Sequence, residues 1–233
     1  MLALQGAFVE HVRILQALGA TAVEVRLPAH LEGLDGLIIP GGESTTIGKL
    51  AELYGLMAPL RQFAQDKPVW GTCAGMIFLA RDIGRDQPLL GLMDIVVERN
   101  AFGRQVDSFE VDLPVPALTP LSSNGAGPFP AVFIRAPKLV SAGKGVTILA
   151  HLADGTAVAA QQGHWLVTSF HPELTGDGRF HQYFLSLLNR QVSDSLRPVQ
   201  HLGQAHGAPS VLVNEADVVQ ELVSVELVVG DLP

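Results

Sequence analysis

The sequence predicts an α/β fold of three layers, in which helices cover both faces of a mixed, mostly parallel central sheet. One all-apolar run, residues 36–39, is typical of a parallel strand that is covered on both faces. Amphipathic helical patterns alternate with strand patterns in the first half of the chain. The second half carries short strand patterns without long helices between them, which is why we expect a mixed sheet.

The elements of the first half follow from their apolar spacing. Residues 6–18 carry apolar side chains at helical intervals, and Gly19 ends this helix. Ser44 is the expected N-cap of a later helix. The predicted elements of this half are the end of a strand at 1–4, a helix at 6–18, strands at 22–27 and 36–39, and helices at 44–53 and 58–65.

From residue 92 onward the pattern changes to short strands and one final helix. The predicted strands lie at 94–98, 108–113, 131–134, 146–152, 156–162 and 164–170, the last three as an antiparallel set, and the helix lies at 178–190. These elements complete one domain, residues 1–191. Residues 192–233 form an extension that we expect to be disordered or of unknown role, because it is first polar and then Val/Leu-rich with interleaved acids.

The composition narrows the class of protein. With 233 residues, of which 48% are hydrophobic, the chain is able to bury a sizeable core in one domain. The sequence lacks an apolar run long enough to cross a bilayer, and its single cysteine fits a reducing compartment, so we expect a cytoplasmic protein without a membrane partner. The net charge of −8 and the absence of a basic patch argue against nucleic acid as a partner.

Residues 71–75, Gly-Thr-Cys-Ala-Gly, lie between an apolar strand and an apolar helix start. A strand that turns at once into a helix crowds its own backbone, which explains the glycine at either end of this pentapeptide. The arrangement is that of a nucleophile elbow with Cys73 in place of serine, at a helix N-terminus where the macrodipole favours a thiolate. A lone cysteine is commonly a buried structural residue, so the pentapeptide by itself leaves both roles open.

A candidate base follows the predicted strand at 164–170. His171-Pro172-Glu173 supplies an imidazole and a carboxylate, which a cysteine nucleophile needs as base and orienting group. If Pro172 keeps the backbone extended, residues two apart point to the same side, and both side chains are expected to face the thiolate. Together with the elbow, this spacing predicts a Cys-His-Glu triad of Cys73, His171 and Glu173.

The segment Pro40-Gly41-Gly42-Glu43-Ser44-Thr45-Thr46 follows the buried strand at 36–39, at the end where open α/β sheets place their ligands. It does not fit the phosphate-binding P-loop pattern G-x-x-x-x-G-K-[ST]. The spacing between the two glycines is one residue too long, and Lys49 is followed by Leu50 rather than by Ser or Thr. Two glycines that present backbone N–H groups suit an oxyanion hole better.

Several motifs in consistent order resemble one family. They are L-Q-G at 4–6, P-G-G-E-S-T-T at 40–46, G-T-C-A-G at 71–75, E-R-N-A-F-G-R-Q-V-D-S-F-E at 98–110, F-I-R-A-P at 133–137 and H-P-E at 171–173. Together they resemble the glutaminase subunits of pyridoxal 5'-phosphate synthase, within the triad (class I) glutamine amidotransferases. The resemblance covers residues 1 to about 190, and it implies a flavodoxin-like fold of the class I amidotransferase type.

The resemblance also implies an activity and a set of site residues. The expected reaction converts L-glutamine to L-glutamate and ammonia, which a synthase subunit in a large hetero-oligomer uses to make pyridoxal 5'-phosphate. Glu43 is expected to bind the α-ammonium of glutamine, and Arg99 or Arg135 its α-carboxylate. The expected site residues are Cys73, His171 and Glu173 for catalysis; Gly42 and Ala74 for the oxyanion hole; Gly42, Glu43, Ser44, Arg99, Ile134 and Arg135 for substrate binding; and Gln5 as a secondary site.

Two alternatives stay open at this stage. One is the glutaminase subunit of another amidotransferase, such as imidazole-glycerol-phosphate synthase, and the other is a non-catalytic interaction subunit. We expect neither a cofactor nor a metal. The histidines outside the triad are interpreted as surface or satisfied core residues: His11, His30, His151, His164, His181, His201 and His206.

Overall fold

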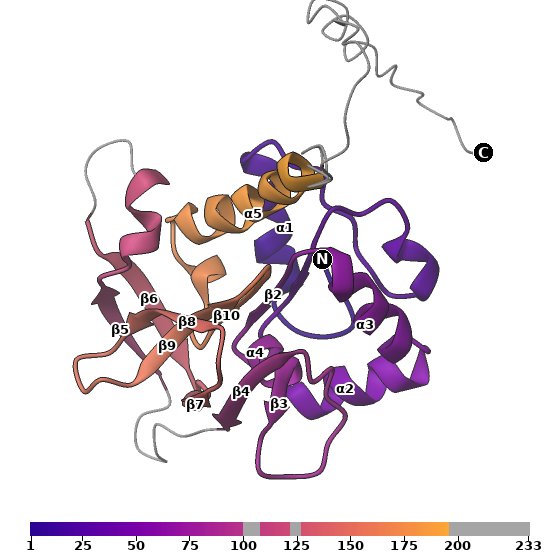
Figure 1. The fold of residues 1–233 in the computed structure, drawn as a ribbon, viewed down its shortest axis with the longest axis horizontal. Coiled ribbons are helices and arrows are strands. Elements are labelled where there is room, and N and C mark those ends of the chain that lie inside the picture. The colour runs from indigo at the N-terminus through magenta and orange to yellow at the C-terminus, as the bar shows by residue number, and fades with distance from the viewer. Residues whose placement is uncertain (100–107, 122–126, 196–233) are drawn as a thin grey trace, which may run out of the picture. The chain divides into compact units, whose positions relative to one another are not determined.

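A five-stranded sheet forms the middle layer of the fold, and it is described here from a computed structural model (Figure 1). The strands in spatial order are β1 (Leu37–Ile39), β2 (Val69–Thr72), β10 (Trp165–Thr168), β9 (Ala157–Gln162) and β8 (Val146–His151). β1, β2 and β10 are parallel, whereas β9 and β8 are antiparallel to their neighbours, so the predicted mixed sheet is confirmed. The structure describes residues 1–99, 108–121 and 127–195.

Alternate residues of the central strands face opposite layers. Leu37 and Ile39 of β1 and Val69 of β2 belong to one apolar cluster, while Ile38 and Trp70 belong to another. All five side chains are buried. This is the double coverage that the all-apolar run at 36–39 predicts.

Helices complete the two outer layers (Figure 1). α2 (Ser44–Leu53), α3 (Met57–Asp66) and α4 (Ala74–Leu79) contribute apolar residues to the cluster that contains Leu37 and Ile39. α1 (Phe8–Ala17) and α5 (Arg179–Ser195) contribute to the cluster on the other face of the sheet. The three-layer prediction is therefore confirmed.

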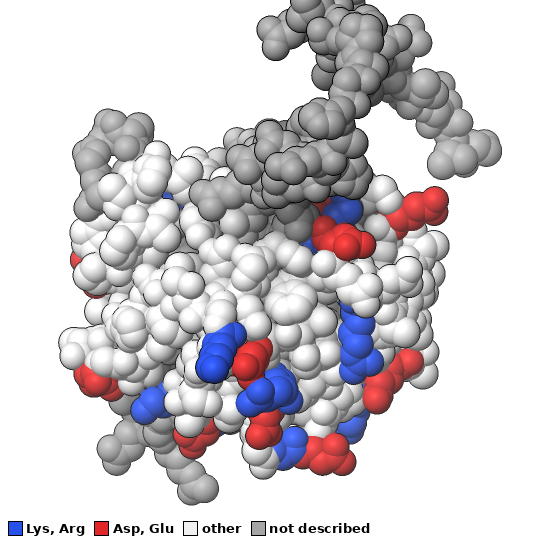
Figure 2. Space-filling model, viewed as in Figure 1, with Lys and Arg blue, Asp and Glu red and all other residues white. Residues whose placement is uncertain are grey.

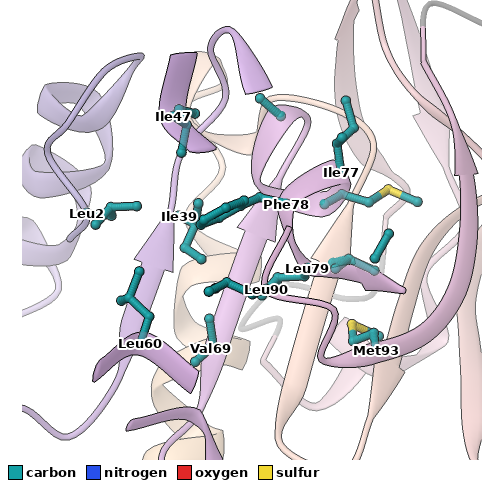
Figure 3. Packing of buried hydrophobic residues seen from close by; sticks show 14 of the residues in the cluster. Leu2, Ile39, Ile47, Leu60, Val69, Ile77, Phe78, Leu79, Leu90 and Met93 are labelled. Atoms are coloured by element: carbon teal, nitrogen blue, oxygen red, sulfur yellow. The ribbon is translucent and has the colours of Figure 1, made fainter. Parts of the chain in front are cut away.

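The first of these clusters shows how a helix is held on the sheet. In Figure 3, Ile39 of β1 lies beside the ring of Phe78 of α4, and Leu60 of α3 lies near Val69 of β2. Phe78 has no exposed surface. The burial of Phe78 holds α4, the helix that begins directly after Cys73, against β1.

Within the described residues, two smaller sheets and three short 3-10 helices complete the fold. The sheets are β3-β4-β7, made of Ala80–Asp82, Met93–Glu98 and Lys138–Ala142, and the hairpin β5-β6, made of Ser108–Leu113 and Phe129–Ile134. The 3-10 helices are η1 (Pro28–Leu31), η2 (Pro116–Leu121) and η3 (Pro172–Leu174).

Most predicted elements match observed ones, and the differences have local causes. The strands predicted at 1–4 and 22–27 are reduced to a single parallel bridge between Leu2 and Val25. Between residues 21 and 27 only Val25 is buried, so this segment packs through one side chain. β3 and β7 are not predicted, because one continues the apolar run of α4 and the other is short and mostly exposed.

Some predictions fall outside the described residues. Residues 100–107, the middle of the motif at 98–110, are among them, as are residues 196–233 of the predicted extension. α5 itself runs to Ser195, past the predicted domain boundary at 191.

The surface shown in Figure 2 carries basic and acidic side chains interspersed with one another. In the described part of the chain, every helix is too short or too polar to cross a membrane. The same residues contain no group of three His, Cys, Asp or Glu side chains that could hold a metal ion.

Candidate active site

Cys73 lies in a strained turn between β2 and α4. Its φ of 48° and ψ of −102° are uncommon for a residue with a side chain, and strain of this kind clusters at functional sites. The backbone N–H of Cys73 donates to the carbonyl of Thr168 in β10 over 2.8 Å. A Cβ at Gly71 would lie 2.5 Å from the backbone of Gly75, and one at Gly75 would collide with the carbonyl of Ile39. Both glycines are therefore required by the turn.

His171 and Glu173 follow β10 and are bonded to each other. His171 Nδ1 lies 2.7 Å from Glu173 Oε1, and the Glu173 side chain has no exposed surface. Pro172–Leu174 is a 3-10 helix, so the prediction that the segment stays extended is wrong. The tight turn points the carboxylate at the imidazole and into the protein, because a 3-10 helix folds residue 173 back toward residue 171.

Cys73 and His171 meet above Gly41, the residue that follows β1 and its Pro40. A Cβ on Gly41 would collide with the His171 ring and would also lie 3.4 Å from Cys73 Cβ. Cys73, His171 and Gly41 thus come from the carboxyl ends of three neighbouring parallel strands, where α/β sheets bind ligands. The absence of a side chain at Gly41 leaves the room in which the two groups approach.

The electrostatics of the site link the three candidate catalytic groups. Burial lowers the pKa of His171, but hydrogen bonds and charges from Cys73 and Glu173 outweigh burial and raise that pKa to about 10. Burial raises the pKa of Glu173, yet the neighbouring side chains of His11 and His171 lower it to about 2. The arrangement favours a charged imidazolium beside the Glu173 carboxylate.

One further predicted residue borders the cysteine, and another follows it in the chain. The carbonyl oxygen of Ile134, the last residue of β6, lies 3.9 Å from Cys73 Sγ. Arg135 has a φ of 43° and an exposed side chain. Arg135 is thus a second residue with a side chain and a positive φ, and strain of this kind clusters at functional sites.

The glycine loop is held by the segment that precedes α1. Gly41 O accepts a hydrogen bond from the backbone N–H of Ala7 over 3.0 Å, and Gln5 Oε1 accepts one from the N–H of Glu43 over 2.7 Å. A Cβ on Gly42 would lie 2.5 Å from Gln5 Oε1. On the other side of the cysteine, Ala74 is the first residue of α4, so its N–H has no acceptor within the helix.

Glu43 and Arg99 are paired with each other. Arg99 donates to Glu43 Oε1 over 2.9 Å, and the same carboxylate accepts from the backbone N–H groups of Thr45 and Thr46. Glu43 is therefore the N-cap of α2, and the prediction that Ser44 has this role is wrong. Burial raises the pKa of Glu43, but the bonds from Thr46 and Thr45 lower it to about 2.

Gln87 belongs to the same network, although no sequence pattern points to it. Its Oε1 accepts from Arg99 over 2.9 Å and from Thr45 Oγ1 over 3.2 Å, and its amide nitrogen lies 3.4 Å from Ser44 Oγ. Ser44 itself is buried at the start of α2. Gln87 thus joins the predicted substrate-binding residues Ser44 and Arg99, and Arg99 in turn pairs with Glu43.

His11 and His181 are the other residues that sequence reasoning missed. Both are fully buried behind Glu173. The one available signal was helical spacing, since His11 lies four residues before the buried Leu15 and so shares its face of α1. His181 carries a similar signal, since it lies three residues before the buried Phe184 of α5.

The comparisons with known proteins agree with the sequence motifs. A profile described as the SNO glutamine amidotransferase family matches residues 1–190. The pyridoxal 5'-phosphate synthase subunit PdxT of Herpetosiphon aurantiacus is 57% identical over 192 residues, covering 80% of this chain and 98% of that protein. The subunit of the same name from Geobacillus kaustophilus is 55% identical over 200 residues, covering 84% of this chain and 98% of that protein.

Solved structures lead to the same family. A crystal structure of a glutamine amidotransferase matches with a TM-score of 0.75 at 52% identity, covering 81% of this chain and 97% of that chain. PurLQS from Thermotoga maritima, with a TM-score of 0.58 at 16% identity, covers 84% of this chain and 96% of that chain and shares the fold. From its profile match and these identities, the chain belongs to the SNO glutamine amidotransferase family.

Proposed function

We propose that this chain hydrolyses L-glutamine to L-glutamate and ammonia, and that it supplies the ammonia to a synthase subunit that makes pyridoxal 5'-phosphate. The family match and the PdxT relatives support this activity. The single observation that carries it is the imidazole of His171, which is bonded to Glu173 and lies with Cys73 above Gly41. A thiol, a base and an orienting carboxylate in this order are the parts of a cysteine-based acyl transfer.

The proposed chemistry uses Cys73 as nucleophile. Its sulfur attacks the side-chain amide carbon of glutamine while His171 holds the thiol proton, and that proton then goes to the departing nitrogen, which leaves as ammonia. Water attacks the resulting thioester, gives a proton to His171, and releases glutamate with the thiol restored. Glu173 fixes the ring and stabilises its positive charge throughout.

The oxyanion that forms on the amide carbon needs hydrogen-bond donors on the side away from His171. We assign this role to the backbone N–H groups of Ala74, at the start of α4, and of Gly42, in the loop beside the cysteine. One such donor lowers the barrier by about 3 kcal/mol. Gln5 contributes indirectly, since its bond to the N–H of Glu43 holds the loop.

Substrate binding is assigned to the charged network at the start of α2. Glu43 would bind the α-ammonium group, and Arg99 or Arg135 the α-carboxylate, with Ser44 and the backbone of Ile134 beside them. Because Glu43 and Arg99 are paired over 2.9 Å, substrate binding would exchange this ion pair for two ion pairs with the amino acid.

A partner subunit follows from the chemistry of the product. Ammonia released into neutral water is protonated and loses its nucleophilicity, so a glutaminase that feeds a synthase gains from docking on it. The PdxT relatives are named as subunits of pyridoxal 5'-phosphate synthase, which supports a hetero-oligomer of this kind. The single cysteine supports a location in the cytoplasm.

The test is Cys73→Ala in the complex with the synthase subunit. Glutamine hydrolysis, measured as glutamate release, should fall by about three orders of magnitude or more, because removing a triad member leaves only binding and the oxyanion hole. Pyridoxal 5'-phosphate formation from ammonium salts should be unchanged, which shows that the synthase subunit is intact. If glutamine-fed synthesis persists in this variant, the assignment of Cys73 is wrong.

A further inference from the structure

Two histidines form a fully buried cluster behind the triad. His11 of α1 and His181 of α5 have no exposed surface, and His11 Nδ1 lies 2.9 Å from His181 Nε2. The ring of Trp70 in β2 packs edge-on against both, with centroid distances of 5.7 Å to His11 and 5.0 Å to His181. Burying a polar ring against an indole costs free energy unless the ring nitrogens are hydrogen-bonded. The partners of each nitrogen therefore determine which proton arrangement is stable.

His11 contacts the carboxylate oxygen of Glu173 that His171 does not use. His11 Nε2 lies 3.3 Å from Glu173 Oε2, whereas Oε1 is bonded to His171 over 2.7 Å. Thr72 Oγ1, one residue before the cysteine, lies 3.4 Å from the same His11 nitrogen. Among the described residues, no donor meets Glu173 Oε2 with full hydrogen-bond geometry. His11 Nε2, at 3.3 Å, is the group placed to donate to it.

The pairing of the nitrogens selects one tautomer. With the proton of His11 on Nε2, that N–H faces the carboxylate, and Nδ1 accepts the N–H of His181 Nε2. His181 Nδ1, which has no partner among the described residues, is then a bare acceptor. The opposite tautomer would aim a lone pair at Glu173 and leave a buried N–H of His181 without an acceptor. Both effects raise the free energy of the folded state, so this tautomer is disfavoured.

We propose that His11 is a positioning residue for Glu173: its Nε2–H, fixed in that tautomer by His181, binds Oε2 and thereby keeps Oε1 aimed at His171. This inference rests on the proposed function, in which Glu173 orients His171, because it explains what holds Glu173 in place. The effect on the reaction passes through Glu173, and neither histidine touches the substrate.

The charges around Glu173 are consistent with this role. The ionisable groups that face it are His171, His11 of α1 and His181 of α5, with Cys73 beyond His171. Burial lowers the pKa of His181 to about 3, so His181 stays neutral at physiological pH. A neutral His181 is what the proposed proton arrangement requires.

Two amide substitutions separate positioning from packing. In His11→Gln the side-chain amide nitrogen reaches about as far as Nε2, so the donor to Glu173 is retained. In His11→Asn, which is shorter by one methylene, the amide reaches only the place of Nδ1 and leaves Oε2 without a donor. Glu173→Gln serves as the reference for complete loss of the carboxylate charge, and His151→Asn, at an exposed histidine, is the control for the substitution itself.

The first readout is alkylation of Cys73 by iodoacetamide as a function of pH. Because the chain has one cysteine, the modification reports on a single thiol. Without the His11 donor, Glu173 holds the His171 imidazolium less well, so the pH of half-maximal alkylation should rise by about one unit in His11→Asn. His11→Gln and His151→Asn should match the wild type, and Glu173→Gln should shift at least as far as His11→Asn.

The second readout is the kinetics of glutamine hydrolysis in the complex with the synthase subunit. His11→Asn should lower kcat about tenfold with KM for glutamine unchanged, and His11→Gln should stay within about twofold of the wild type. An equal effect of both amides, or no effect of His11→Asn on either readout, overturns the inference. A wild-type complex that hydrolyses no glutamine would overturn the proposed function instead, while the alkylation comparison still decides the role of His11.

A measurement on the unsubstituted protein covers the case in which His11→Asn fails to fold. Ring nitrogen NMR of the histidine-labelled complex should show His11 and His181 as neutral rings protonated at Nε2. A ring of His11 protonated at Nδ1 would overturn the inference.

Discussion

A carboxylate deep in a protein is costly unless its oxygens are paired, and Glu173 illustrates how the site meets that cost. His171 lies 2.7 Å from one oxygen and His11 lies 3.3 Å from the other. The pKa of Glu173 falls from 4.5 to about 2, which means that the folded state binds the proton more weakly than the unfolded chain does. Under the proposed function, Glu173 therefore links activity and stability.

This linkage predicts a pH dependence of stability. The lowered pKa contributes to the free energy of unfolding above pH 4.5, and the contribution, about 3 kcal/mol, is lost as the pH falls from 4.5 through 2. Glu173→Gln should therefore lose less stability than the wild type across that interval, as measured by urea unfolding at pH 6, 4 and 2.5. Equal losses in the two proteins would show that the carboxylate is not held in its charged form.

At the scale of elements, the junction of β2 and α4 has little freedom. A strand, a residue with φ of 48° and a buried helix follow one another without a loop, and the carbonyl of Ile39 in β1 closes over Gly75. The geometry that exposes Cys73 to His171 is thus imposed by backbone packing rather than by the cysteine side chain.

Gly75→Ala tests that constraint. The added Cβ would meet backbone that cannot move aside, so the free energy of unfolding should fall by about 2 kcal/mol or more, and glutamine hydrolysis should fall with it. Gly176→Ala is the matched control, since a Cβ there has open space, and it should change stability by less than about 0.5 kcal/mol. Chemical denaturation measures the free energy of unfolding of both variants. A Gly75→Ala protein as stable as the Gly176→Ala control would contradict the account.

The sequence predicted this junction well because its physics is local. Glycine spacing, an apolar strand and an apolar helix start lie within a few residues, and each restricts the backbone by itself. The same holds for the limits of α2 and α3, which apolar periodicity predicts closely. The order of the last three strands was likewise predictable from their short spacing.

What the sequence did not predict depends on neighbours distant in the chain. In the helix predicted at 6–18, Val9 is one of the apolar residues at helical spacing, yet it is 40% exposed. His11 is buried instead, because Glu173 and His181 approach that side of the helix. Glu43 rather than Ser44 caps α2, with Arg99 drawn to the same carboxylate. Such partners are 56 to 170 residues apart, which no local pattern records.

At the scale of the whole molecule, the site depends on two apolar clusters that hold the central sheet between its helical layers. The strands β1, β2 and β10 end together, and each is followed by one part of the site: Gly41, Cys73 and His171. The layers thus set the distances among groups that the sequence places far apart.

Two leucines test the contribution of the cluster beneath the site. Leu60 of α3 is 1% exposed, whereas Leu53 at the end of α2 is 74% exposed. Leu60→Ala should lower the free energy of unfolding by about 2–5 kcal/mol, and Leu53→Ala by less than about 0.5 kcal/mol. Urea unfolding of the pair provides the comparison, and similar losses would mean that α3 does not support the fold as described.

The most direct test of the central claim is covalent labelling of the complex with a glutamine analogue that carries a diazoketone in place of the amide. Mass spectrometry should find one adduct, on the peptide that contains Cys73, and His171→Ala should slow its formation by at least about a hundredfold. An adduct on another residue, or labelling of Cys73 at an undiminished rate without His171, would contradict the account.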